Sequence, residues 1–245
     1  MASGATDGAM YDLGIDTAAD DASLALLRGD EVVAQRAWHV DSTMSRELLA
    51  QLDALLVEAG VARQQIASIA VVTGPGTYGA VRTGIATAQG LALALDVPLA
   101  GIGRFEADAA RYLDAVAPER VVIAAHEAGR SGTAWAAYTL AGSIDGAPRC
   151  LVAPRLDTPA EVARTAPAPA LWCGEVTAAL LDALRDAERA SGDTVPSLDD
   201  GAPAGGRAVA LVRIARARQA YGDPALVDAF YLRPPSITRA KPREA

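Results

Sequence analysis

A corner of glycine, proline and glycine constrains the possible folds of this chain more than any other feature. Gly74, Pro75 and Gly76 join an apolar run at 66–72 to a long alanine-rich run. Glycine can adopt positive φ or let another backbone approach closely, and proline fixes one torsion of a bend. We therefore predict a buried strand at 66–72, a tight structural corner, and a helix that includes 82–95.

Regular elements surround this corner in a recognisable order. We predict antiparallel strands before it, a helix with a regular apolar stripe at 45–59, and a strand after the second helix at 97–102. The antiparallel strands are expected at 10–16, 23–27 and 31–38. Three strands, a helix, a strand, a helix and a strand make up a ribonuclease-H-like unit.

A second and shorter pass through similar elements begins near residue 105. We predict helices there at 107–115 and 207–221, and strands at 121–125, 134–140, 150–153 and 170–173. The chain is therefore predicted to be an α/β protein with two ribonuclease-H-like halves, whose mixed sheets are flanked by helices. This is the architecture of the actin, Hsp70 and sugar-kinase (ASKHA) superfold.

The expected domain organisation has four parts. Residues 1–9 are a disordered leader, 10–104 with 223–234 form a first lobe, 105–222 form a second lobe, and 235–245 are a basic tail. A stretch of the second lobe at 191–206 is rich in Gly, Pro, Ser and Asp, and we expect it to be a surface loop.

Composition excludes several classes of protein. The chain has 30 Asp and Glu against 22 Lys and Arg, whereas a protein that binds nucleic acid by itself needs clustered cations. The longest apolar region, 84–102, is interrupted by polar residues and proline, so we predict no membrane span. Two isolated cysteines fit neither a disulfide framework nor a zinc pair. We expect a cytoplasmic protein without a membrane partner.

The corner also permits a nucleotide-binding interpretation. Gly74, Gly76 and Gly79 form a G-x-G-x-x-G sequence between a strand and a helix, as in a dinucleotide fingerprint. The acidic residue expected at the end of the next strand is missing, and the corner follows the fourth predicted strand rather than the first. A Walker A loop is excluded because no Gly-Lys-Ser/Thr follows. A dinucleotide-dependent oxidoreductase is one alternative.

A small-molecule kinase or ATPase is the second enzymatic alternative, because this superfold usually binds ATP between its halves. Asp16 with Asp20 or Asp21 could hold magnesium in the turn after the first strand. That turn has no glycine and no cation, and its extra carboxylates would repel a triphosphate.

The sequence gives little indication of a metal site or a catalytic triad built on histidine. His39 and His126 are the only histidines and have no partners at helical spacing, so we predict no metal site. A hydrolytic triad needs a base, a nucleophile and an orienting acid, and no nucleophile elbow surrounds His126. We expect His126 to lie at the surface, and we predict neither catalytic residues nor a cofactor.

Four segments in the same order resemble the TsaB (YeaZ) family. They are Leu-Gly-Ile-Asp-Thr at 13–17, the helix at 45–60, Gly-Pro-Gly-Thr-Tyr at 74–78 with Arg82 after it, and Phe-Tyr-Leu-Arg-Pro-Pro at 230–235. The resemblance is dense over 10–112 and thin over 140–220. Where the family has Thr-Gly after the aromatic residue, this chain has Gly79 and Ala80, so Gly79 is interpreted as incidental. The family's Asp-Ala-Arg segment is reduced to 127–130 here, which leaves its role open.

The resemblance implies a non-catalytic subunit of bacterial tRNA threonylcarbamoyladenosine synthesis. It implies a TsaD-type catalytic paralogue as partner, a TsaE-type ATPase as third member, and a homodimer that competes with the active pair. tRNA would be reached only through the complex. The modified base would be the adenosine beside the anticodon of tRNAs that read codons starting with A.

The resemblance also implies that helices 45–59 and 82–95 form the dimer surface. In the helix at 82–95, small residues four positions apart leave one face without bulky side chains. A glycine inside a helix, such as Gly90, costs about 1 kcal/mol of stability relative to alanine. The expected contact residues are Ser45, Leu48, Leu49, Leu52, Arg82, Ala86, Gly90 and Leu93.

Overall fold

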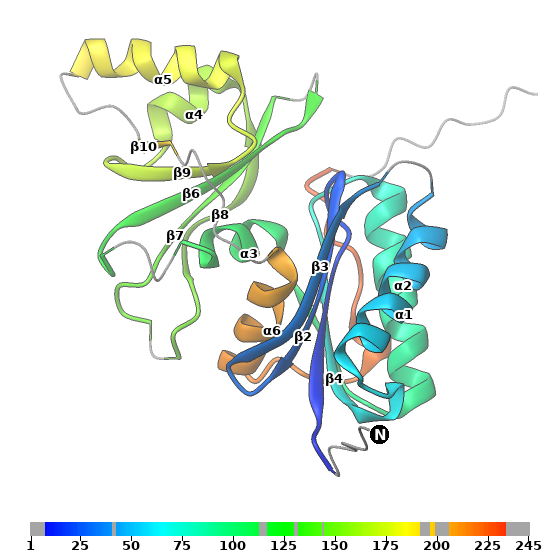
Figure 1. Cartoon of the computed structure of the whole chain (residues 1–245). Helices are drawn as coiled ribbons and strands as arrows, with labels where there is room; N and C mark the ends of the chain where they lie inside the picture. Colours follow the sequence, from blue (N-terminus) through cyan, green and yellow to red (C-terminus); the bar gives the residue numbers. More distant parts are fainter. Residues whose placement is uncertain are drawn as a thin grey trace, which may run out of the picture.

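Two five-stranded mixed sheets with helices on their faces form the molecule (Figure 1). The computed structural model describes residues 8–40, 43–112, 117–129, 132–143, 145–191, 197–198 and 206–233. The predicted basic tail and nearly all of the predicted leader lie outside these residues. Within these ranges, no helix has the length and apolar character needed to cross a membrane.

The first sheet has the strand order β3-β2-β1-β4-β5. β2 is antiparallel to β1 and β3, whereas β4 is parallel to β1 and to β5. Its strands are β1 (Tyr11–Asp16), β2 (Asp21–Arg28), β3 (Glu31–His39), β4 (Ile66–Val72) and β5 (Leu99–Ile102). All five lie close to their predicted positions.

Two long helices cover one face of this sheet, α1 (Met44–Ala59) and α2 (Tyr78–Leu95). A short 3₁₀ helix, η1 (Arg63–Gln65), leads from α1 into β4. The apolar side chains of α1 recur at helical spacing, so Leu48, Leu52 and Leu55 all point into the core. α1 ends at Gly60, whose φ of 64° is left-handed and therefore favours glycine.

The second sheet repeats the topology of the first. Its order is β10-β9-β6-β7-β8, with β6, β7 and β8 antiparallel in turn and β9 parallel to β6 and β10. Its strands are β6 (Val121–Glu127), β7 (Thr133–Thr139), β8 (Arg149–Asp157), β9 (Ala170–Gly174) and β10 (Ser197–Leu198). The predicted class of two ribonuclease-H-like halves is confirmed. β10 lies inside the segment predicted as a loop, because it pairs with Leu171 and Trp172 of β9.

The helices of the second lobe are α4 (Pro159–Thr165) and α5 (Ala178–Ser191). α4 and α5 pack together, and Leu180 and Leu184 of α5 join the core on that side of the sheet. Thr158 caps α4: its hydroxyl accepts a hydrogen bond from the backbone N–H of Glu161, whose carboxylate in turn accepts one from the N–H of Thr158. Neither helix was predicted, although Leu180 and Leu184 of α5 stand at helical spacing.

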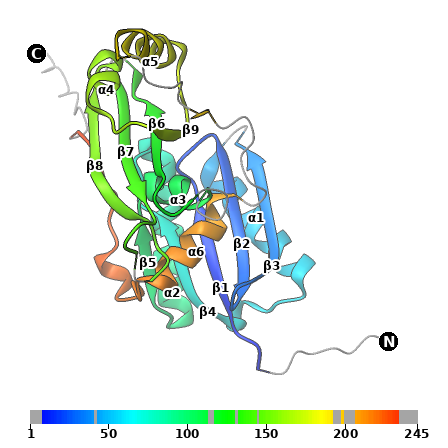
Figure 2. The ribbon, with the colours of Figure 1, turned by 90° about the vertical axis from the view of Figure 1, so that its left-hand side faces the viewer.

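Two further helices cross between the lobes. α3 (Arg104–Ala110) follows β5 of the first sheet but packs mainly on β6, β7 and β9 of the second. α6 (Arg207–Ala217) follows β10 of the second sheet but packs on β1, β2, β4 and β5. They contact each other where the sheets meet (Figure 2).

This crossing changes the expected division of the chain. We expected 105–222 to form the second lobe, whereas α6 belongs by packing to the core of the first. The close approach depends on Gly14 of β1, because a Cβ there would collide with the backbone of Ala208. The order of elements along the sequence carries no sign of this exchange.

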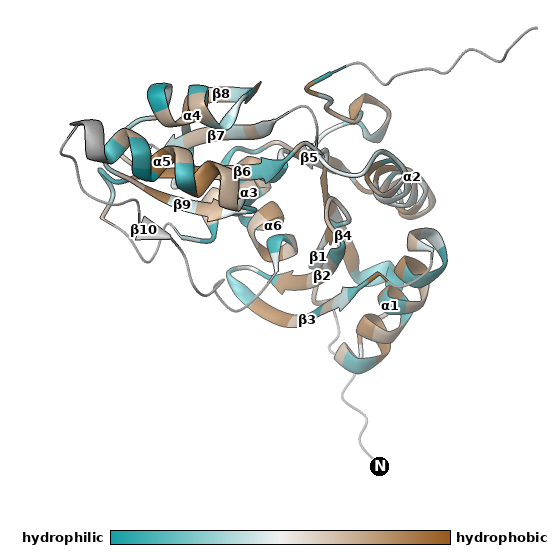
Figure 3. Ribbon diagram, turned by 90° about the horizontal axis from the view of Figure 1, so that it is seen from above, coloured by the Kyte–Doolittle hydropathy of each residue, from teal (hydrophilic) through white to brown (hydrophobic). Residues whose placement is uncertain are grey.

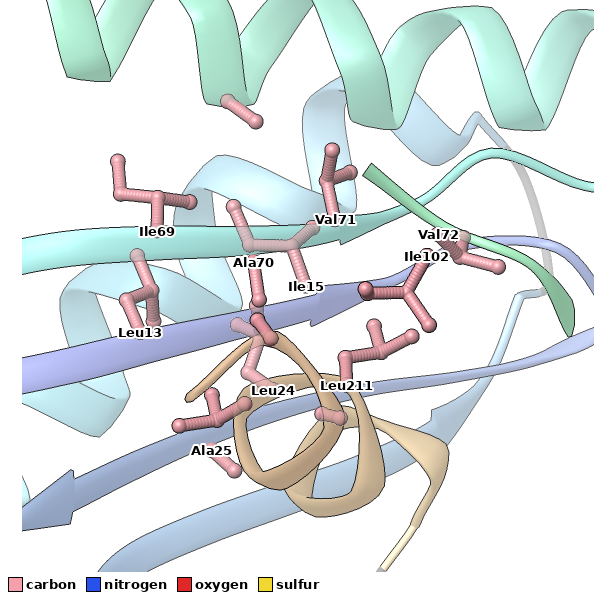
Figure 4. Close-up of a cluster of buried hydrophobic side chains, with 14 of the residues drawn as sticks. Leu13, Ile15, Leu24, Ala25, Ile69, Ala70, Val71, Val72, Ile102 and Leu211 are labelled. Atoms are coloured by element: carbon pink, nitrogen blue, oxygen red, sulfur yellow. The ribbon is translucent and has the colours of Figure 1, made fainter. Parts of the chain in front are cut away.

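The core of the first lobe lies between its sheet and the helices on both faces. Leu13, Ile15 and Leu24 of the strands and Leu211 of α6 are fully buried, and Figure 4 shows them with their aliphatic neighbours. Figure 3 shows α6 on one face of this sheet, with α1 and α2 on the other. Burial on both faces explains why β4 is almost continuously apolar.

The last described segment packs against β5 and α2 of the first lobe. Gly222 bridges to Leu99 of β5, and the backbone N–H of Phe230 donates to the carbonyl of Thr73 over 2.8 Å. Between them lies a short 3₁₀ helix, η3 (Pro224–Leu226). Gln89 of α2 donates to the carbonyls of Pro224 and Val227 over 2.9 and 3.0 Å. The segment is thereby fastened to both β5 and α2.

Candidate functional site

The glycine-proline-glycine corner packs against the turn after β1. Gly74 has a φ of 101°, a left-handed value that favours glycine. A Cβ at Gly76 would collide with the carbonyl of Ala18, so the close approach here is made by the protein's own backbone. Gly79 has open space where a Cβ would stand, so the third glycine of the apparent fingerprint has no steric role. The corner therefore has the features of a structural joint.

Alanine substitutions distinguish the structural role of Gly76 from that of Gly79. Gly76→Ala is expected to lower the free energy of unfolding by about 1–3 kcal/mol, because the added methyl group displaces the Ala18 backbone. Gly79→Ala is expected to leave stability unchanged or raise it by up to about 1 kcal/mol, because it removes a glycine from a helix. Urea unfolding of both variants measures the difference. Equal destabilisation by the two substitutions would contradict the role assigned to Gly76.

The outer face of α1 and α2 carries large exposed apolar side chains. Leu49 and Val57 of α1 are 52% and 82% exposed, and Leu93 of α2 is 71% exposed. Gly90 and Ala86 lie one and two helical turns before Leu93 on the same helix and are also exposed. The two helices pack side by side (Figure 1), and we call the exposed residues Leu49, Val57, Ala86, Gly90 and Leu93 the apolar face of α1 and α2. The exposed carboxylate of Asp53 lies one helical turn from both Leu49 and Val57.

Two of the predicted contact residues are not available on this face. Leu48 and Leu52 are buried against the first sheet, so the prediction that they contact a partner is wrong. Ser45 and Leu49 of α1 are exposed. Val57 was not among the predicted contact residues; it lies eight residues after Leu49, which turns its side chain about 80° round the helix from that of Leu49.

Arg82 holds the C-terminal segment onto the first turns of α2. Its Nε donates to the hydroxyl of Tyr231 over 3.0 Å, and its guanidinium lies 4.6 Å from the ring centre of Tyr78. The two tyrosine rings stack at 5.4 Å. Arg82 is exposed at the edge of the apolar face, and its role toward a partner stays a prediction.

A network of charged side chains lies where the lobes meet. Arg207 of α6 donates to Asp16 at the end of β1 over 2.7 Å and to Asp108 of α3 over 3.2 Å. Arg104 of α3 donates to the carbonyl of Ala18 over 3.2 Å and to Glu175, after β9, over 2.7 Å. The network thus connects strands of both sheets through the crossing helices.

His126 is part of this network, so the prediction of a surface histidine is wrong. It lies at the end of β6, is 4% exposed, and its Nε2 is 2.8 Å from Oδ2 of Asp108. Its Nδ1 is 3.5 Å from Oε1 of Glu175. Asp108 is 18 residues away in sequence and Glu175 is 49, which is why sequence spacing did not indicate them.

Both acidic partners of His126 stay ionised at neutral pH. Burial by itself would raise the pKa of Asp108, but the hydrogen bond to His126 and the charges of Arg207 and Arg104 outweigh burial and lower it. The hydrogen bond to His126 and the charge of Arg104 lower the pKa of Glu175 to about 2, against the opposing effect of burial. Together they provide two carboxylates that can only accept hydrogen bonds.

A pocket of about 350 Å³ opens beside this network. The turn after β1 and the glycine-proline-glycine corner form its first-lobe wall, and β6, β7, β8 and the segment after β9 form its second-lobe wall. Its polar lining residues are Asp20, Thr77, Arg104, His126, Glu127, Glu175 and Arg233.

The nucleotide-binding alternatives find little support in this geometry. Both carboxylate oxygens of Asp16 are engaged, one by the N–H of Ala18 and one by Arg207, so Asp16 is not free to hold magnesium. Asp21 pairs with His39 over 2.9 Å. In the part of the chain that the structure describes, no three His, Cys, Asp or Glu side chains are grouped to bind a metal ion.

Comparison with known proteins agrees with the fold. Residues 40–171 match the family model of tRNA N6-adenosine threonylcarbamoyltransferase. The tRNA threonylcarbamoyladenosine biosynthesis protein TsaB of Bacillus subtilis is 35% identical over 104 residues, which cover 42% of this chain and 45% of that protein. The tRNA N6-adenosine threonylcarbamoyltransferase of Nitratidesulfovibrio vulgaris is 38% identical over 113 residues, covering 40% and 31%.

A solved structure extends the similarity beyond the first lobe. YeaZ from Pseudomonas aeruginosa superimposes with a TM-score of 0.71 at 25% identity, over 91% of this chain and 100% of that one. The sequence matches to the two curated relatives above span less than half of the length of each.

Proposed function

The chain belongs to the TsaB (YeaZ) family, and from this we propose that it is a subunit of the machinery that makes threonylcarbamoyladenosine in tRNA. We propose that it works by binding a TsaD-type catalytic paralogue rather than by catalysing the transfer itself. The paralogue would modify the adenosine beside the anticodon of tRNAs that read codons starting with A. The proposed site of action is the cytoplasm.

The exposed apolar face of α1 and α2 is the observation that supports this proposal best. Leu49, Val57 and Leu93 leave large apolar areas in contact with water, a feature typical of a protein-binding surface. The small side chain at Ala86 and the missing one at Gly90 would let a partner helix approach the backbone of α2 closely. A second copy of the chain would fit the same face, so we propose a homodimer that competes with the active pair.

The remaining members of the proposed assembly are inferred from the family resemblance and from the charge of the chain. A TsaE-type ATPase is proposed as the third protein from the family resemblance. tRNA is proposed to be reached through the complex, because the net charge of −8 disfavours direct binding to phosphates. The kinase alternative is not proposed further, since Asp16 is held by Arg207.

Depletion of the protein in its source organism tests the proposed function. We expect the threonylcarbamoyladenosine content of bulk tRNA, measured by mass spectrometry of nucleosides, to fall to near zero and to recover on complementation. Recovery is also expected with Asp20→Asn, which would remove a candidate magnesium ligand of the kinase alternative. Unchanged modification after depletion would contradict the proposal.

A further inference from the structure

The last described residues cross from one lobe to the other, and we call residues 227–233 the strap. Val227 packs against the core of the first lobe, and the backbone N–H of Phe230 donates to the carbonyl of Thr73 over 2.8 Å. Two residues further along the chain, Leu232 packs against the core of the second lobe. The strap therefore joins the two cores over a few residues.

Leu232 forms part of the wall of the pocket between the lobes. It lines this pocket of about 350 Å³ together with Ala134 and Leu156 of the second lobe and with Pro75 of the corner. Leu232 is only partly buried, so it lies between the second-lobe core and the open space of the pocket. Withdrawal of this side chain would widen the pocket and expose apolar atoms of the core to water, which is unfavourable.

Tyr231, the residue before Leu232, is held by the first turns of α2. Its hydroxyl accepts a hydrogen bond from Nε of Arg82 over 3.0 Å, and its ring stacks on that of Tyr78 with 5.4 Å between the ring centres. The Arg82 guanidinium lies 4.6 Å from the ring centre of Tyr78 and 6.0 Å from that of Tyr231, so one cation contacts both rings. Because consecutive Cα atoms are about 3.8 Å apart, Leu232 stays near the pocket while Tyr231 is held.

We propose that the strap is a latch: Tyr231, held by Arg82 and Tyr78, seats Leu232 against the second lobe and keeps the pocket between the lobes narrow. Loss of the contacts to α2 releases Tyr231, and Leu232 then leaves the pocket wall. Arg82 is a positioning residue in this device, because it acts on Leu232 through Tyr231. A molecule that takes Arg82 away from Tyr231 would open the pocket from the surface of α2. The latch does not depend on the proposed function.

Thiol labelling of the full chain with the substitution Leu232→Cys measures whether the latch is closed. The introduced thiol is partly covered by the second lobe while Tyr231 is held, and it becomes open to a maleimide when Tyr231 is released. The exposed Cys150 is replaced by serine in every sample, whereas the buried Cys173 stays as an internal reference for the second-lobe core. Mass spectrometry of peptides follows the labelling of each thiol with time.

Three substitutions in this background test the latch. Arg82→Gln is expected to speed labelling of the introduced thiol about tenfold, because it removes both the hydrogen bond and the cation from the two rings. Tyr231→Phe keeps the stacked rings and loses only the hydroxyl, so an increase of about threefold is expected. Arg46→Gln removes an exposed arginine from the first turn of α1 and should leave the rate unchanged.

Three results would overturn the proposal. Labelling of Arg82→Gln at the unchanged rate would show that Arg82 does not hold the strap. Equal acceleration by Arg46→Gln would show that the effect is not specific to the contacts of Tyr231. Faster labelling of Cys173 in Arg82→Gln would show that the second-lobe core itself had loosened, which the release of a surface latch does not cause.

Discussion

Replacement of Gly90 by tryptophan is expected to weaken both self-association and binding of the TsaD-type paralogue by about 100-fold or more, which corresponds to about 3 kcal/mol. Gly90 is exposed, and nothing lies within 4 Å of the position that a Cβ would occupy. The indole ring would therefore project from the fold without disturbing it and would hold a partner helix away from α2. Sedimentation velocity measures the self-association.

Gly90→Ala is the matched control for this substitution. A methyl group adds little bulk to the face and removes the cost of a helical glycine, so association should persist and the melting temperature should rise slightly. Association of Gly90→Trp at wild-type strength would place the interface elsewhere. Loss of association with a lower melting temperature would mean that the substitution had disturbed the fold instead.

Replacement of Asp108 by alanine is expected to lower the free energy of unfolding by about 3–5 kcal/mol. The carboxylate of Asp108 is 2.8 Å from Nε2 of His126 and 3.2 Å from a terminal nitrogen of Arg207, and all three groups are largely buried. Its removal leaves an arginine without one of its acceptors where the lobes meet, and water cannot replace the lost contact fully.

The pH dependence of this stabilisation has a definite sign. Because the fold lowers the pKa of Asp108, its contribution is complete above the ordinary value of 3.8 and is lost as the pH falls through the lower folded value. The stability difference between the wild type and Asp108→Ala should therefore shrink in acid. Urea unfolding at pH 7 and at pH 3 measures it.

Asp53→Ala is the control for Asp108→Ala. Asp53 also lies in a helix and pairs with an arginine, Arg63, but both side chains are about half exposed. Exposed ion pairs contribute about 0–1 kcal/mol, so a small effect is expected. Similar losses for Asp53→Ala and Asp108→Ala would contradict the stabilising role given to the buried network.

Local sequence patterns were sufficient for the sheet of the first lobe and for α1 and α2, but not for α6, which completes its core. The apolar spacing of α1 and the strand–corner–helix order around Gly76 determine which residues face the core, and both depend on neighbours in sequence. The same spacing could have excluded Leu48 and Leu52 from the contact surface, because they belong to the stripe that packs on the sheet. A side chain on that stripe cannot also face a partner.

The network where the lobes meet could not be predicted in this way. Arg207 and Asp16 are 191 residues apart, and Arg207 and Asp108 are 99 apart, so no periodicity connects them. They meet because α3 and α6 each pack on the other lobe's sheet. His126 was expected at the surface because its acidic partners come from α3 and from the segment after β9, two elements that only the folded chain brings together.

Co-purification from a lysate of the source organism tests the central claim most directly. The tagged wild-type chain, Gly90→Ala and Gly90→Trp are compared, and recovered proteins are identified by mass spectrometry. We expect a larger TsaD-type paralogue with the wild type and with Gly90→Ala, and its absence with Gly90→Trp. Recovery of the paralogue by all three would contradict the proposed interface. Its absence from all three, with ATP binding by the isolated chain, would contradict the proposed function.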